Sequence, residues 1–91
     1  MFNLGELISM GYVQDGDVLV WKQPRLGVTH SATITRGGEI VTCDGIVHRS
    51  PSGAARHCYK KPIDGWYNWR LVRTGQRLDQ VRKEAMDGKT P

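Results

Sequence analysis

The apolar residues at the two ends of the chain recur at the three- and four-residue spacing of an amphipathic helix. The two apolar stripes consist of Leu4, Leu7 and Ile8 at one end and Leu78, Val81 and Ala85 at the other. Asn3 is placed to cap the first helix, and Glu6 stands at the reciprocal position of a capping box. The pattern therefore predicts a short helix at each end of the chain.

Between these helices the apolar pattern changes to that of β-strands. Residues 17–22 are a β-rich run with little strict alternation, which predicts a strand covered on both faces. Residues 28–35 alternate between an apolar row that includes His30 and a row of hydroxyl side chains. Residues 39–50 fold back at residues 44–45, where Asp-Gly is a strong signal for a two-residue hairpin turn. Four antiparallel strands are expected.

Ser50 and Pro51 predict the start of a helix in the middle of the chain. Serine suits the N-cap, and proline suits the first helical position because its φ is already helical and it lacks an N–H that would be unpaired there. The segment from Pro51 to about Lys60 is therefore expected to be helical. Lys60 and Lys61 favour the negative C-terminal end of this helix.

Residues 66–72, WYNWRLV, are expected to return to the sheet as a fifth strand. Alternation along a strand would place Trp66 and Asn68 on one face and Tyr67 and Trp69 on the other, so only one pair could be in the core. We expect Trp69 to be buried and Trp66 to be partly exposed.

These elements predict an α+β fold, in which a small antiparallel sheet of about five strands is joined by short helices in the order α-β-β-β-β-α-β-α. A chain of 91 residues has the size of one domain. This domain is expected to span residues 1–87, with residues 88–91 as a frayed tail. Since residues 1–11 lack a basic leader and a continuous apolar run, a cytoplasmic location is expected, in association with the nucleoid in a bacterium.

The formal net charge of +4 is concentrated in one part of the chain. Residues 1–44 carry three basic and five acidic side chains, whereas residues 45–77 carry seven basic and one acidic. Residues 78–91 carry three of each. This distribution indicates an anionic partner, with nucleic acid as the first candidate.

The acidic residues do not indicate a metal-dependent nuclease. Such an enzyme needs carboxylates that converge on a cation, but the nine here are scattered along the chain. Four of them lie in turn signals, where local hydrogen bonding is their ordinary role: Asp15, Asp17, Asp44 and Asp64. We therefore expect no catalytic activity.

Cys43, His48, His57 and Cys58 are the only residues whose order suggests a metal site. Their spacing differs from the paired CxxC pattern of structural zinc, and His57 and Cys58 are helical neighbours whose side chains diverge by about 100°. We expect no metal and no other cofactor, with both cysteines as free thiols. His30, on the apolar side of its strand, is expected to be a hydrogen-bonded core histidine.

The start of the central helix is the best candidate for a phosphate site. A helix N-terminus exposes unpaired N–H groups and positive dipole, and the sequence SPSGAA surrounds them with hydroxyls and little side-chain bulk. We expect Ser50 to cap the helix while Ser52, Gly53 and Arg56 face outward. The alternative is a capped helix that only packs on the sheet.

The candidate DNA contacts combine this helix start with the nearby cations and one aromatic side chain. Trp66 is the candidate for a contact to a base or to a methyl group on it. The full set is Lys22, Arg25, Arg49, Ser50, Ser52, Gly53, Arg56, Lys60, Lys61 and Trp66.

Four segments carry a family resemblance through their order and spacing: GDVLVWKQPRLGVTHSATIT, GGEIVTCDGIVHRSPSGAA, DGWYNW and LDQVR. Together, from about Leu4 to Arg82, they resemble the RAMA domain, which is named for its association with restriction enzymes and adenine methylases. The resemblance implies a small α+β module that accompanies restriction and modification systems and reads DNA, with N6-methyladenine as the proposed mark. The family often has an aromatic residue where this chain has Asn68.

Residues and resemblance together predict a non-catalytic module that binds double-stranded DNA as a reader of N6-methyladenine. The expected partners are double-stranded DNA, with adenine methylation as the mark that the resemblance implies, and a protein of a restriction or modification system, without a membrane. The alternative is a protein-interaction module whose basic face docks an acidic partner or whose edge strand adds to another sheet.

Overall fold

The structure is a computed structural model that describes all residues 1–91. Its helices are α1 (Leu4–Ser9), α2 (Pro51–Tyr59), α3 (Gly65–Asn68) and α4 (Leu78–Met86), and a 3-10 turn, η1, covers Pro24–Leu26. Its strands are β1 (Val18–Gln23), β2 (Val28–Ile34), β3 (Ile40–Thr42), β4 (Val47–His48) and β5 (Arg70–Leu71). The α+β class, the five strands and the expected order of the elements are confirmed, with α3 as an additional one-turn helix.

All neighbouring strands of the single sheet are antiparallel, in the order β4-β3-β2-β1-β5. The long β1–β2 hairpin runs from Val18 opposite Thr33 to Gln23 opposite Val28. In contrast, β5 pairs with β1 only through Leu71 opposite Leu19 and its neighbour. Therefore β1 extends well beyond the end of β5.

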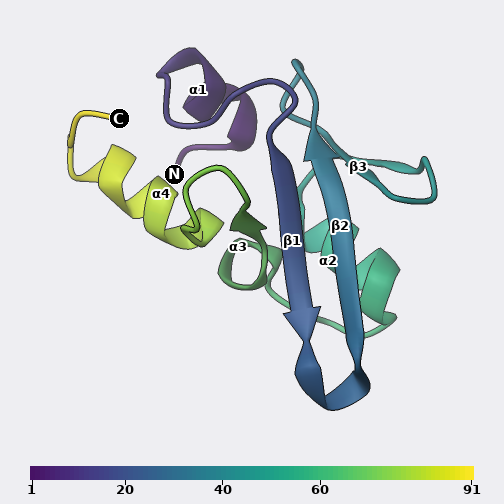
Figure 1. Cartoon of the computed structure of the whole chain (residues 1–91). Helices are drawn as coiled ribbons and strands as arrows, with labels where there is room; N and C mark the ends of the chain where they lie inside the picture. The colour runs from purple at the N-terminus through teal and green to yellow at the C-terminus, as the bar shows by residue number, and fades with distance from the viewer.

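One face of the sheet packs on α2, which lies behind β1 and β2 in Figure 1. We call it the inner face, and its side chains include the buried Trp21, Ala32, Ile34 and Ile40. The indole of Trp21 contacts Tyr59 of α2 with ring centroids 5.9 Å apart. The opposite, outer face is uncovered by α2 and carries polar and small apolar side chains.

The expectation that β1 is covered on both faces is wrong. Its residues alternate, with Leu19 and Trp21 buried and Val18 and Lys22 exposed. The apolar run misled the prediction because Val18 and Val20 are β-branched residues that suit a strand exposed on its outer face as well as a buried one.

The turn between β3 and β4 has three residues rather than the expected two. The Thr42 N–H donates to the Ile46 carbonyl, so residues 43–45 form the connection. Gly45 has a φ of 84°, the left-handed conformation that closes three-residue hairpin loops. The hydroxyl of Thr42 also donates to Asp44 Oδ1, which holds the loop on the end of β3.

Residues 66–68 are helical, so the prediction of a strand from Trp66 is wrong. The Asp64 carboxylate accepts from the Trp66 N–H and caps α3. The Trp69 N–H then donates to the Gly65 carbonyl and closes this single turn. The chain joins the sheet only at Arg70. The local capping by Asp64 therefore overrides the aromatic, strand-like composition.

The two terminal helices predicted from the apolar stripes are confirmed as α1 and α4. Both reciprocal bonds of the capping box between Asn3 and Glu6 are present in α1. The residues expected to fray include Lys89, whose carbonyl accepts from the Tyr12 hydroxyl. Figure 1 shows both termini on the side of the molecule formed by α1 and α4.

Candidate nucleic-acid interface

The first turn of α2 confirms the predicted cap. Ser50 is extended, and its hydroxyl accepts from the Gly53 N–H at 3.0 Å. Pro51 occupies the first turn and is buried. The helix therefore starts where serine at the N-cap and proline at the first helical position predict it.

The same turn is not the open phosphate site that the sequence suggested, because α3 covers it. The Ser52 hydroxyl accepts from the Gly65 N–H at 3.0 Å, and the Pro51 carbonyl accepts from Trp69 Nε1 at 3.0 Å. A Cβ on Gly65 would lie 2.0 Å from the Pro51 carbonyl oxygen. Ser52 is thus engaged inside the protein rather than free to face outward.

The cations of the α2 segment are exposed in the way the sequence predicted. They are Arg49, Arg56, Lys60 and Lys61, and none of them lies within 4.0 Å of a carboxylate. Arg56 lies on α2, whereas Lys60 caps the C-terminal end of the helix. Lys60 ends α2 in the left-handed conformation, with a φ of 65°.

Arg25 lies near the C-terminal end of α2, at the tip of the β1–β2 hairpin. It lines a hollow of about 530 Å³ together with Leu26 and Tyr59. The Lys61 ammonium lies 5.7 Å from the centroid of the Tyr59 ring. We call the exposed cations Arg25, Arg49, Arg56, Lys60 and Lys61 the α2 basic surface.

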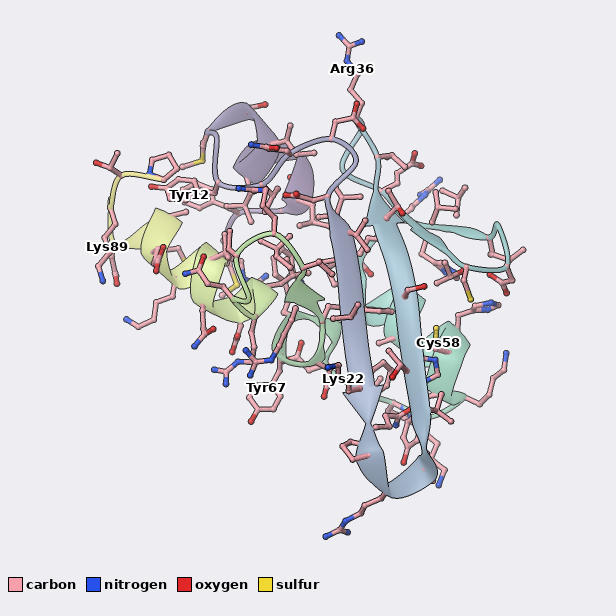
Figure 2. All side chains as sticks on the ribbon, viewed as in Figure 1. Tyr12, Lys22, Arg36, Cys58, Tyr67 and Lys89 are labelled. Atoms are coloured by element: carbon pink, nitrogen blue, oxygen red, sulfur yellow. The ribbon has the colours of Figure 1, made fainter.

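Lys22 does not belong to the α2 basic surface. It follows the buried Trp21 on β1, so its side chain projects from the outer face, opposite to α2. Figure 2 shows Lys22 on the lower part of β1, on the side of Tyr67. The structure therefore divides the predicted cations between two faces.

Trp66 is partly buried against the core, and the Arg82 guanidinium of α4 lies over its ring at 3.8 Å from the centroid. Trp69 is fully buried, as expected. One face of Trp66 is therefore occupied by a cation–π contact, which competes with stacking on a base.

Sequence reasoning missed a second group of cations, on the outer side of the molecule. Lys22, Tyr67, Arg70 and Arg77 line a hollow of about 440 Å³ beside the end of β5. Arg70 and Arg77 are seven residues apart and pair across an isolated bridge. For Arg70 and Arg77 the only sequence signal was the basic excess of residues 45–77, which does not show how its members are placed, whereas Lys22 was already a predicted DNA contact.

The model of the family described as "Restriction Enzyme Adenine Methylase Associated", RAMA, matches residues 2–90. The chain belongs to this family. The match confirms the resemblance and extends it beyond Arg82 to nearly the whole chain. A comparison with curated proteins found no match. No helix of this RAMA domain is long and apolar enough to cross a membrane.

Three of the four aspartates that lie in turns have partners within the RAMA domain: Asp17, Asp44 and Asp64. Asp17 receives two hydrogen bonds from the Arg73 guanidinium, at 2.8 and 2.9 Å, and one from the Gln14 N–H. The bonds from Arg73 lower the pKa of Asp17. This pair joins the start of β1 to the turn after β5.

Asp44 links the β3–β4 loop to α2. Its Oδ2 lies 2.6 Å from His57 Nε2, and its Oδ1 accepts from Thr42, whose hydroxyl lies 3.2 Å from His48 Nε2. The bonds from Thr42 and His57 hold the pKa of Asp44 well below its usual range. Burial, with His57 nearby, lowers the pKa of His48.

The candidate metal residues are arranged in pairs. No group of three or more His, Cys, Asp or Glu side chains is placed to hold a metal ion. Cys43 and Cys58 are free thiols, and burial raises the pKa of Cys58. His30 is half-buried on the inner face, where its Nε2 lies 2.6 Å from Gln23 Oε1. This contact matches the expected hydrogen-bonded core histidine.

Proposed function

We propose that this RAMA domain is a non-catalytic module that binds double-stranded DNA through the α2 basic surface. One observation carries the proposal: five exposed cations lie on α2, beside its two ends along the chain or at the hairpin tip next to Tyr59, and none is neutralised by a carboxylate within 4.0 Å. Membership of a family associated with restriction enzymes and adenine methylases supports it.

Phosphates are the natural partners of such a surface. Each lysine or arginine that neutralises a phosphate releases a counterion, so these contacts give affinity that falls with salt and carries no base preference. The covered first turn of α2 leaves this role to the side-chain cations. Ser50, Ser52 and Gly53 then act indirectly, by fixing the direction of the helix that presents Arg56.

Selectivity for N6-methyladenine is the finer part of the proposal. The methyl group adds an apolar contact in the major groove, so a reader needs apolar surface beside its cations. Leu26 is 60% exposed at the hairpin tip and lines the same hollow as Arg25 and Tyr59. This hollow meets the requirement better than Trp66, whose ring is covered by Arg82.

The test is a titration of a fluorescent duplex at several salt concentrations. We expect Arg56→Ala to leave folding unchanged and to reduce the slope of log affinity against log salt by about one unit. Arg36→Ala is the matched control, because Arg36 is exposed at the far end of the sheet (Figure 2) and lies outside the α2 basic surface.

An unchanged affinity and salt slope in Arg56→Ala and Lys60→Ala would remove α2 from the interface. No binding of the parent protein at low salt would instead favour the protein-interaction alternative. A paired titration with methylated and unmethylated duplexes tests the selectivity for N6-methyladenine. Leu26→Ser should reduce the preference for the methylated duplex while preserving the salt slope.

A further inference from the structure

The end of β5 leaves an open corner on the sheet. β5 pairs with Leu19 and Val20 of β1, while the last three residues of β1 have no neighbouring strand on that side. The hollow of about 440 Å³ occupies this corner. Its walls come from β1, from α3 and β5, and from the turn before α4, so three separated segments build it.

The charge of the hollow is strongly one-sided. Lys22, Arg70 and Arg77 line it, and no carboxylate does. Lys22 and Arg70 lie more than 4.0 Å from every carboxylate, whereas Arg77 is paired with Asp79 at 2.9 Å. Two unneutralised cations facing one concave space favour an anionic ligand.

The hollow also offers features that a bare anion would not use. The Arg77 guanidinium lies 4.6 Å from the centroid of the Tyr67 ring and occupies one face of it, as Arg82 does for Trp66. Unlike Trp66, which is partly buried, Tyr67 is 54% exposed and so keeps accessible ring surface. Asn68 donates from its amide nitrogen to the Asp64 carbonyl at 2.7 Å, which leaves its side-chain carbonyl oxygen without a donor from the protein. An aromatic wall and an unused acceptor suit a planar ring that carries an amino group.

We propose that this corner binds a nucleotide, with its phosphate held by Lys22 and Arg70 and its base placed against Tyr67. The exocyclic amino group of the base donates to the Asn68 carbonyl oxygen. A volume of about 440 Å³ lies in the range of small-molecule sites. The hollow and the α2 basic surface share no residue, so this site does not depend on the proposed DNA interface.

An acidic peptide added as a strand is a weaker fit. The free edge of β1 is three residues long, from Trp21 to Gln23. This is shorter than an average strand of about five to six residues, so strand addition would gain few ladder hydrogen bonds.

The probe is adenosine monophosphate, followed by amide chemical shifts in a titration of the whole chain. We expect shifts at residues 20–22 and 67–70, and tighter binding than for inorganic phosphate or adenosine alone. Lys22→Ala and Tyr67→Leu should each weaken binding about tenfold, as loss of one charge-assisted or stacking contact does. Arg36→Ala should bind like the parent protein.

Arg70→Lys provides a second test of the phosphate contact, because the substitution keeps the positive charge but removes the forked guanidinium. In the parent protein this guanidinium also donates to the Gly75 carbonyl. Absence of shifts at the hollow, or adenosine monophosphate that binds no better than phosphate, would overturn the proposal. A short single-stranded oligonucleotide distinguishes the source of the ligand. Tighter binding than the mononucleotide assigns the site to a nucleic-acid strand, and weaker binding assigns it to a free nucleotide.

Discussion

Trp69 joins the core to the first turn of α2 through a single side chain. Its indole is fully buried, and its Nε1 donates to the Pro51 carbonyl, an acceptor at the start of the helix. Its ring also packs edge-on against Trp21, with centroids 5.9 Å apart. Removal of this side chain would therefore leave a cavity and remove the hydrogen bond that joins α2 to the core.

We expect Trp69→Ala to lower the free energy of unfolding by about 3 to 5 kcal/mol, which approaches the whole stability of so small a domain. Trp66→Phe should cost much less, because Trp66 is only partly buried. Urea denaturation of the two variants and the parent protein measures the difference. Equal losses in the two variants would contradict this division between a core and a peripheral tryptophan.

At the scale of elements, the contact between α2 and α3 depends on one glycine. The Gly65 Cα packs on the peptide between Pro51 and Ser52, where an added Cβ would lie 2.0 Å from the carbonyl oxygen of Pro51 and 2.6 Å from the nitrogen of Ser52. Both neighbours are backbone atoms and cannot rotate away. The two helices can approach this closely only because residue 65 lacks a side chain.

Gly65→Ala should therefore lower the free energy of unfolding by about 3 kcal/mol, at the upper end of overpacking effects. Gly37→Ala is the control, because Gly37 has no positive φ and its Cβ would meet no atom nearer than 3.8 Å. Thermal melting compares the two variants. A small, equal shift for both would mean that α3 can move away from α2 at little cost.

The fold could be predicted where local chemistry and the apolar pattern agree. The capping box at Asn3, the cap at Ser50 and the stripe of Leu78, Val81 and Ala85 are all present. The strand predicted at Trp66 failed for two reasons: Asp64 caps a helical turn, and Gly65 must approach Pro51, a residue 14 positions earlier. No local pattern reports the second contact.

The candidate site could be predicted only in part for the same reason. Charge in the sequence located the cations of the α2 segment because Arg56, Lys60 and Lys61 lie close together along the chain. It did not separate Lys22 from them, since the side of a strand that faces a helix is set by packing. It also missed the hollow at Arg70, whose walls come from three segments.

At the scale of the whole molecule, the Asp17–Arg73 pair joins parts of the chain 56 residues apart. The Asp17 side chain is almost fully buried, and its pKa is lowered in the folded protein. A lowered pKa means that the pair contributes its full stability above the unfolded pKa, about pH 4. That contribution is lost as the pH falls through the lower folded pKa.

Asp17→Asn should consequently destabilise the protein at pH 7 and have a progressively smaller effect below about pH 4. Melting temperatures of the variant and the parent protein from pH 7 to pH 2 measure the change. Asn can still accept from the Gln14 N–H through its one carbonyl oxygen, but its amide nitrogen cannot accept from Arg73, so the variant removes the charge together with one of the two Arg73 hydrogen bonds. A constant difference across the pH range would show that the Asp17 charge does not stabilise the fold.

The attachment of Lys89 to Tyr12 also determines how this domain can be handled. Both ends of the chain leave from the side of α1 and α4 (Figure 1), whereas Arg25 lies at the tip of the β1–β2 hairpin. A fluorophore, an affinity tag or a solid support joined to either end would therefore stand clear of that tip. Single-molecule tethering and surface immobilisation are accordingly compatible with free access to the hairpin tip, which belongs to the proposed DNA interface.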